Sequence, residues 1–318
     1  MDRLDPEMNQ GLLSEKFGAR EMDITVGIIG LGPMGGNIAR ILLEKSFSVA
    51  GFDIKAERMK PLGEVGMVMT QSTIEVADKA DVLITSLPNM AALEVVAVEI
   101  AKSQKKNQII AETSTLALED KLGIYQKLKA RSKIMLDCPI SGTPSMLVGM
   151  TASIYGSGDE DAYRTCLPVF EEFTATNYFV GEVGNGTKMK LLANYLVHVH
   201  TTAAAECMVM GQKAGLDPEL IYRALKPGAG GSKMFDIRGA MMAKSDYREG
   251  GGTMFAIYEK DADIITNFAA SIKAPIDLYA SSLQKMNSAI SLGLGHLDTS
   301  AVCKAIEVAV GIDRKLAE

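Results

Sequence analysis

Residues 24–35 read Ile-Thr-Val-Gly-Ile-Ile-Gly-Leu-Gly-Pro-Met-Gly, a short apolar run that passes directly into a glycine-rich turn. The run 24–29 predicts a buried strand, and residues 33–45 predict the helix that follows it. The turn between them has the spacing G-x-G-x-x-G, which in a strand–turn–helix context is typical of a site for the pyrophosphate of a dinucleotide. These twelve residues therefore predict a dinucleotide-binding α/β domain.

Each glycine of this turn has its own physical reason. Gly30 allows the tight turn after the strand, Gly32 lets the backbone approach a phosphate, and Gly35 lets the helix pack against the strand. The free N–H groups at the start of the helix can then bind an anion. We therefore expect six cofactor-binding residues in this turn: Gly30, Leu31, Gly32, Pro33, Met34 and Gly35.

An acidic residue stands at the expected distance beyond the turn. Asp53 ends a second strand-like run, 47–53. Its carboxylate could accept hydrogen bonds from ribose hydroxyls and would repel a 2′-phosphate. Lys55 and Arg58 follow closely and could soften that repulsion. The sequence thus predicts NAD as the preferred cofactor, with NADP as the alternative.

Strand-like and helical patterns divide the chain into two halves. Further strand-like runs recur in the first half at 82–86, 108–111, 133–137, 151–155 and 178–180. Because helix-like stretches separate these runs, they predict βαβ units and a parallel sheet. The second half has helical spacing, first in one long helix from Thr187 to about Ala214, closed by Gly215, and then at 221–225, 234–242, 255–268, 276–292 and 300–310.

These patterns predict an α/β protein of two domains. We expect a Rossmann-type parallel-sheet domain over 23–183 and an all-α C-terminal domain over 184–318, joined by the long interdomain helix. The all-α domain would serve substrate binding and dimerisation. Residues 1–22 are expected to form an N-terminal tail outside the fold.

Composition excludes several classes of partner and site. The net charge of −6 argues against nucleic acid as the main partner, because phosphate binding needs a basic face. The four cysteines are far apart and predict neither a disulfide framework nor a zinc site, so no metal is expected. No apolar run approaches the ~20 residues of a membrane span, and the N-terminus lacks the apolar core of a secretory signal. A cytoplasmic location, without membrane association, is the expectation.

Two later segments carry groups suited to chemistry. Asp137–Thr143 (Asp-Cys-Pro-Ile-Ser-Gly-Thr) follows a predicted strand, so it falls at the sheet edge where ligands bind in this architecture. Its hydroxyl and backbone N–H groups suit a carboxylate, although such a segment alone is more often just a turn. Lys190 and Asn194 are four residues apart on the long helix and therefore share one face, which we expect to point into the interdomain cleft. Lys188 is expected to be an ordinary surface charge.

Taken together, these segments resemble the β-hydroxyacid dehydrogenase family, which includes 3-hydroxyisobutyrate dehydrogenases, 2-hydroxy-3-oxopropionate reductases and threonate-type dehydrogenases. The resemblance runs from Asp23 to the C-terminus. It is carried by segments that match family signatures in order: the turn at 30–39, Ser86-Leu87-Pro88, Ser114-Thr115-Leu116, Asp137–Thr143, the helix start with Gly184, Gly186, Lys190 and Asn194, and Lys260-Asp261.

The resemblance implies a function and a set of site residues. It implies hydride transfer between NAD(P) and a small β-hydroxy acid or its semialdehyde, such as 3-hydroxyisobutyrate, 2-hydroxy-3-oxopropionate or a threonate-like acid, in a homodimer or homotetramer. Lys190 would be the general acid/base, and Asn194 would help to hold Lys190 and the reacting oxygen. The remaining implied residues are Ser141, Gly142 and Thr143 for the substrate, and Leu87, Pro88, Thr115 and Lys260 for the cofactor.

Departures from the family pattern leave the identity of the substrate open. Thr143 stands where the family usually has a second glycine, and Ala193 replaces the first asparagine of a pair. Two other functions remain as alternatives. An imine reductase would usually have Asp or Tyr at the position of Lys190, and a non-catalytic dinucleotide-binding module would be expected to lose that lysine or to acquire a basic tail.

Overall fold

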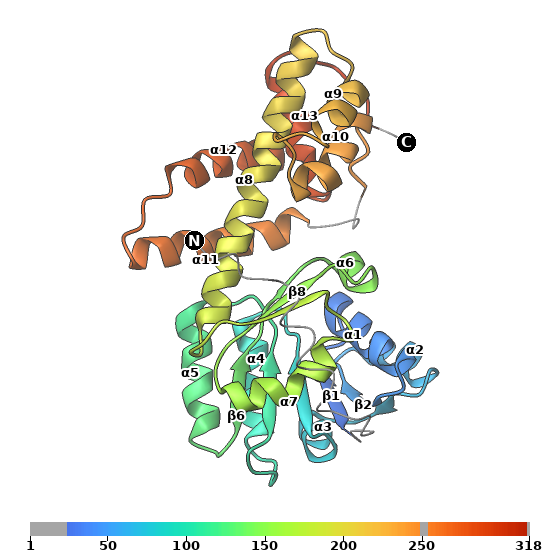
Figure 1. The fold of residues 1–318 in the computed structure, drawn as a ribbon, viewed down its shortest axis with the longest axis vertical. Helices are drawn as coiled ribbons and strands as arrows, with labels where there is room; N and C mark the ends of the chain where they lie inside the picture. The colour runs from blue at the N-terminus through green and yellow to red at the C-terminus, as the bar shows by residue number, and fades with distance from the viewer. Residues whose placement is uncertain (1–23, 249–253, 317–318) are drawn as a thin grey trace, which may run out of the picture.

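The computed structural model describes residues 24–248 and 254–316, which form a sheet-containing lobe and a helical lobe (Figure 1). The N-terminal tail expected over 1–22 lies outside the described residues. The two lobes are linked by one long helix, α8 (Asn185–Lys213), whose first turn packs against the sheet lobe and whose remainder runs through the helical lobe. The expected α/β architecture with a long interdomain helix is confirmed.

The main sheet is six-stranded and parallel throughout, with the strand order β3-β2-β1-β4-β5-β6. The order reverses between β1 and β4, which creates the crevice where ligands bind in open α/β sheets. The strands are β1 (Thr25–Ile29), β2 (Ser48–Phe52), β3 (Val68–Met69), β4 (Val82–Thr85), β5 (Ile109–Glu112) and β6 (Ile134–Asp137).

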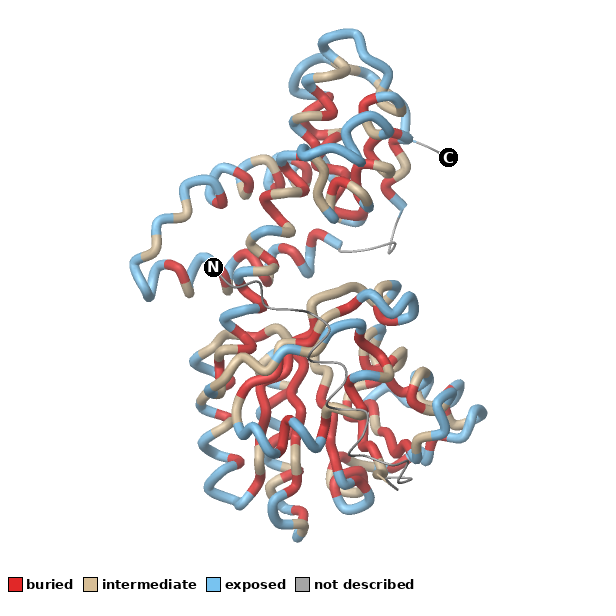
Figure 2. Tube along the Cα trace, viewed as in Figure 1, coloured by how far each residue is buried: buried red, intermediate tan, exposed pale blue. Residues whose placement is uncertain are grey.

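Helices cover both faces of this sheet, which is why its strands are continuous apolar runs rather than alternating ones. Figure 2 shows the resulting buried layer running through the middle of the lobe. One face packs against α1 (Pro33–Glu44), α2 (Ala56–Gly63) and α7 (Glu160–Phe170). The other packs against α3 (Thr73–Lys79), α4 (Met90–Ile100) and α5 (Leu118–Lys129).

A second, smaller sheet corrects the expectation of a single parallel sheet. The runs expected at 151–155 and 178–180 form β8 (Ser153–Gly156) and β9 (Thr176–Phe179), and they pair with β7 (Ile140–Ser141) instead of extending the main sheet. Only the short helix α6 (Pro144–Val148) connects β7 to β8, so the two strands run antiparallel. The segment expected to be a simple turn after β6 therefore contains a strand.

The helical lobe packs its elements around α8. The pair α11 and α12 extends to one side of α8, and the remaining helices gather around its C-terminal half (Figure 1). Asp217 is the N-cap of α9: its side chain accepts a hydrogen bond from Leu220 N, as its position before Pro218 predicts. The elements are α9 (Pro218–Leu225), η2 (Phe235–Gly239), α10 (Ala240–Lys244), α11 (Phe255–Ser271), α12 (Asp277–Ser291), η3 (Thr299–Ala301) and α13 (Val302–Ala309).

The helix expected over 234–242 is not a regular α-helix. Its first part is the π-helical turn η2, and α10 begins only at Ala240. The wider turn buries Arg238, whose guanidinium donates to Thr201 Oγ1 at 2.6 Å and lies 3.5 Å from Asp298 Oδ1. Across 24–248 and 254–316, every helix is too short or too polar to cross a membrane.

The close packing of α1 on the glycine turn yields a stability prediction. A Cβ at Gly35 would lie 2.0 Å from the carbonyl oxygen of Gly30, so Gly35→Ala must push α1 away from the turn. We expect a loss of about 1–3 kcal/mol in the free energy of unfolding, the usual cost of overpacking. Urea denaturation followed by circular dichroism measures this change.

The matched control is Gly123→Ala in α5, because a Cβ there meets nothing within 4 Å and the glycine is exposed inside a helix. That substitution should leave stability unchanged or raise it by up to about 1 kcal/mol. Equal effects of the two substitutions would contradict the packing argument.

Candidate functional site

The glycine turn forms an open cradle at the start of α1, between β1 and β4. Gly30 has φ +91, and a Cβ there would lie 2.3 Å from Ser86 O on the neighbouring strand end, so this position needs glycine. A Cβ at Gly32 would meet only Arg58 Nη1 at 3.8 Å. Gly32 is also the N-cap of α1 and makes no side-chain cap hydrogen bond, with Pro33 next to it. The helix end therefore presents open space and its positive dipole to an anion, which fits a dinucleotide pyrophosphate.

Asp53 lies at the end of β2 beside this turn, buried at 5% exposure. Its Oδ2 accepts from Leu31 N at 2.7 Å and lies 3.2 Å from Arg58 Nη1, while Oδ1 accepts from Lys55 N at 2.8 Å. Asp53 thus also holds the glycine turn in place, a role that its spacing did not predict. Ile54, the next residue, is 89% exposed and offers an apolar surface at the same edge.

The Leu87-Pro88 segment, expected to bind the cofactor, is tied to the Ser114-Thr115 turn. Leu87 N donates to Ser114 Oγ at 2.8 Å, which fixes the segment after β4 against the segment after β5. Pro88 is exposed next to it, at the N-terminal approach to α4. Thr115 is half-buried, and its carbonyl oxygen accepts from Lys260 Nζ of α11 at 2.8 Å. The structure therefore brings Lys260 from the helical lobe directly onto this turn.

The expected substrate segment lies on β7 and the turn into α6. Ser141, Gly142 and Thr143 are all half-buried. The Thr143 hydroxyl accepts from Met146 N at 3.3 Å and contacts Ser145 Oγ at 2.8 Å, so it caps α6. Thr143 thus has a local structural use as the cap of α6.

Lys190 and Asn194 are both buried on one face of α8, as their spacing predicts, at 8% and 7% exposure. Asn194 Nδ2 donates to Asp261 Oδ2 of α11 at 2.7 Å, and Asp261 Oδ1 lies 3.3 Å from Lys260 Nζ. Asn194 therefore influences Lys190 by orienting Asp261, whose charge acts on the lysine. Lys188 is exposed, as expected for a surface charge.

Burial and two charges, those of Asp261 and Lys260, set the protonation of Lys190. Its pKa is lowered to about 8: burial is the largest cause, Asp261 acts in the opposite direction, and Lys260 acts in the same direction as burial. Burial raises the pKa of Asp261, while the charges of Lys260 and Lys190 and the hydrogen bond from Asn194 oppose that rise. An amine that titrates near neutral pH can exchange a proton with a substrate hydroxyl.

The polar face of α8 continues beyond the lysine. His198, eight residues and about two turns beyond Lys190, contacts Tyr279 Oη through Nδ1 at 2.7 Å. Burial and the charges of Arg238 and Lys190 lower the pKa of His198 to about 3, so it is neutral when Lys190 titrates. A neutral buried histidine here adds no positive charge to the site.

Sequence reasoning missed several residues that shape this site. Asp261 was named only as part of the Lys260-Asp261 signature, and the sequence assigned it no role of its own. Arg58 was noted only as a charge near the cofactor edge, whereas it pairs with Asp53. Lys121, in α5, is 1% exposed and ion-paired with Glu112 and Asp137, yet its position in the sequence is that of an ordinary helix lysine.

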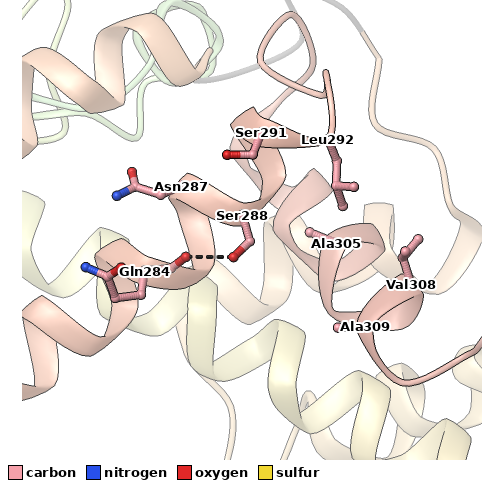
Figure 3. A pocket seen from close by; sticks show the side chains of 8 residues that line it. All are labelled: Gln284, Asn287, Ser288, Ser291, Leu292, Ala305, Val308 and Ala309. Carbon is pink, nitrogen blue, oxygen red and sulfur yellow. Dashed lines mark hydrogen bonds between the residues drawn. The ribbon is translucent and has the colours of Figure 1, made fainter.

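A separate hollow of about 500 Å³ lies far from these groups, between α12 and α13 (Figure 3). Its lining carries no charged side chain and consists of Gln284, Asn287, Ser288, Ser291, Leu292, Ala305, Val308 and Ala309. It lacks a group able to transfer a proton, so we place the functional site at the glycine turn and α8 instead.

Two family models match the chain and together cover both lobes. The NAD-binding domain of 6-phosphogluconate dehydrogenase matches residues 25–181, and the NAD-binding region of NADP-dependent 3-hydroxyisobutyrate dehydrogenase matches residues 184–306. An L-threonate dehydrogenase of Cupriavidus necator is 30% identical over 89% of this chain and 96% of its own length.

Solved structures agree with these matches. A 3-hydroxyisobutyrate dehydrogenase from Salmonella typhimurium superposes with a TM-score of 0.79 at 29% identity, covering 88% of this chain and 99% of that one. An imine reductase from Pseudomonas sp. gives a TM-score of 0.59 at 22% identity over 89% of this chain and 99% of its own, which shows a shared fold alone. The chain therefore belongs to the β-hydroxyacid dehydrogenase family and is an NAD(P)-dependent dehydrogenase of hydroxy acids.

Proposed function

We propose that Lys190 is the general acid/base of a reversible oxidation of a small β-hydroxy acid. The observation that carries this proposal is a lysine buried on α8, where its pKa is lowered to about 8, chiefly by burial, and the charges of Asp261 and Lys260 act on it. Asn194 donates a 2.7 Å hydrogen bond to Asp261 and so helps to hold the negative charge of Asp261 near the ammonium of Lys190. An imine reductase or a non-catalytic binding module gives no use for a lysine in this state.

The residues divide the work of binding and proton transfer. The glycine turn, from Gly30 to Gly35, would hold the pyrophosphate, Asp53 the adenosine ribose, and Leu87, Pro88 and Thr115 the nicotinamide side. A bound nicotinamide supplies the acceptor or donor of hydride. Lys260, whose ammonium donates to Thr115 O, closes the helical lobe over that turn and adds positive charge.

Proton transfer at Lys190 Nζ completes the reaction. During oxidation, the neutral amine takes the hydroxyl proton as the carbon–hydrogen bond gives up hydride, and a carbonyl results. During reduction, the ammonium returns that proton to the forming alkoxide. Ser141 and the backbone of Gly142 and Thr143 would hold the substrate carboxylate at the edge of the sheet.

The substrate class follows from the relatives and the site together. L-threonate dehydrogenase and 3-hydroxyisobutyrate dehydrogenase are the activities named for similar proteins. We therefore propose a C3–C4 acid or its semialdehyde: 3-hydroxyisobutyrate, 2-hydroxy-3-oxopropionate or a threonate-like acid. The buried carboxylate of Asp53 favours NAD over NADP because it would repel a 2′-phosphate, although Arg58 beside it reduces that repulsion.

A substrate panel with wild-type protein and Lys190→Ala tests this function. We expect one of these hydroxy acids to reduce NAD more efficiently than NADP, measured by absorbance of the reduced nicotinamide. Lys190→Ala should lose at least ~100-fold in turnover and keep dinucleotide affinity, because only the proton-transferring group is removed. Lys188→Ala, exposed on the same helix, is the control and should retain wild-type rates. Near-normal turnover in Lys190→Ala would remove the proposed role.

The direction of pH dependence also follows from Lys190. Since its pKa is about 8, the rate of oxidation should rise through that pH as the amine becomes neutral, and the rate of reduction should fall there. Asp261→Asn removes a charge that raises this pKa, so the oxidation limb should move to lower pH. Profiles of kcat/KM in both directions measure this. An oxidation limb at the ordinary pKa of lysine, or an Asp261→Asn shift to higher pH, would contradict the assignment.

We also propose that the protein is a cytoplasmic homodimer or homotetramer. The support is a set of exposed apolar side chains in the helical lobe, including Leu192 and Leu196 of α8, Ile272, and Leu278 of α12, each about half exposed or more. Light scattering of the full chain should give two or four subunits, and a monomer at micromolar concentration would reject the oligomer. Fractionation of host cells tests the location.

A further inference from the structure

We propose that Lys121 is a positioning residue for Lys190. It acts by neutralising Glu112 beside Asp137, so that Asp137 can hold the first turn of α8. This inference rests on the proposed function of Lys190. It concerns a buried ion cluster in the sheet lobe, defined here as Lys121, Glu112 and Asp137.

The ion cluster is fully buried and closely spaced. Lys121 Nζ lies 2.5 Å from Asp137 Oδ1 and 2.6 Å from Glu112 Oε2, and it donates to Ser114 O at 3.1 Å. Each of the three side chains is at most 1% exposed. Burial opposes the charge of Lys121, but Asp137 and Glu112 outweigh it and raise the lysine's pKa. Lys121 therefore stays charged at every pH at which the protein would work.

The two carboxylates need this charge because of where the sheet places them. Glu112 ends β5 and Asp137 ends β6, and the two residues are direct partners in the parallel register. Like charges opposite each other on neighbouring strands repel, and the dry surroundings strengthen that repulsion. The ammonium of Lys121, on α5, lies between the two carboxylates and forms an ion pair with each, which offsets their mutual repulsion.

Asp137 connects the ion cluster to α8 through hydrogen bonds. Its Oδ2 accepts from Thr187 N at 2.7 Å, and its Oδ1 accepts from Thr187 Oγ1 at 2.8 Å. Next to it, Ser157 Oγ accepts from Gly186 N at 3.0 Å. These contacts satisfy free N–H groups of the first turn and place a negative charge at the positive helix end. Lys190 follows Thr187 by three residues, so the hold on Thr187 sets the position of the next turn, which carries Lys190.

The same cluster anchors the cofactor side of the site. Glu112 Oε1 accepts from Ser114 N at 2.9 Å, and Ser114 Oγ accepts from Leu87 N at 2.8 Å. The lysine thus links the nicotinamide-side turn to the helix with the proton-transferring amine. A misplacement of about 1 Å between such groups can cost about 100-fold in rate.

The test compares Lys121→Met with the double variant Glu112→Gln/Lys121→Met. In the single variant the two carboxylates face each other, and Lys190 should lose its position. We expect kcat per folded protein to fall at least ~10-fold. The half-maximal pH for oxidation should rise from about 8 by at least ~0.5, because a displaced amine regains water.

The double variant removes the repulsion and leaves Asp137 free to bind Thr187, so its rate and pH limb should return to within about threefold and ~0.2 of wild type. Lys127→Met is the matched control, because Lys127 is exposed on the same helix in a surface pair with Glu94. Asp261 and Lys260 of α11, and His198 of α8, are the charged and titratable groups that act electrostatically with Lys190, and none of these variants alters them.

Three outcomes would overturn the inference. One is a Lys121→Met protein whose kcat per folded molecule and pH limb match wild type. Another is a loss of kcat per folded molecule with an unchanged pH limb, which would mean that Lys121 affects turnover without positioning Lys190. The third is a double variant that recovers neither property, and this outcome decides the question even if the single variant does not fold. If Lys190→Ala itself kept its turnover, the proposed function would fail first, and that result is separate from these.

Discussion

The first turn of α8 lies directly against the carboxyl edge of the sheet lobe, and the relation of the two lobes depends on that contact. A Cβ at Gly186 would lie 2.5 Å from both Asp137 O and Tyr155 O, so only glycine permits the approach. Asp137 then binds Thr187 through both carboxylate oxygens. Since the helix is stiff over 29 residues, this contact fixes the orientation of everything that α8 carries.

Exclusion of water from Lys190 is the second condition for the chemistry. Lys190 has its pKa lowered chiefly because it is buried, and Asp261 alone would have the opposite effect. The contact of Lys260 with Thr115 O brings α11 over the same region and helps to keep water away. The two lobes therefore supply different things: the sheet lobe supplies a cradle for a dinucleotide, and the helical lobe supplies the low-dielectric wall around the amine.

Local pattern was enough to predict most of the fold. The strand–turn–helix at 24–45 and the long helix both follow from short-range rules, and they appear as expected. The second sheet and the π-helical turn at Arg238 were missed. Both depend on contacts between distant segments, namely β8 with β9 and Arg238 with Thr201 and Asp298.

The site shows the same division. The positions of Lys190 and Asn194 on one buried face follow from helical spacing, because four residues make about one turn. The pairing of Asn194 with Asp261 spans 67 residues, and that of Lys121 with Asp137 joins two different elements of the sheet lobe. In the sequence Lys121 looks like Lys127 and Lys129 of the same helix, and only the packing of α5 on the sheet distinguishes it.

The meeting point of the two family models has a consequence for how such proteins can change over time. One model ends at residue 181 and the other begins at 184, beside the close backbone packing around Gly186. Recombination at this junction would separate Gly186 and Thr187 from the Asp137 they require. The two halves are adjacent in sequence but depend on each other at this contact, so an exchanged helical lobe would have to present groups that bind Asp137 in the same way.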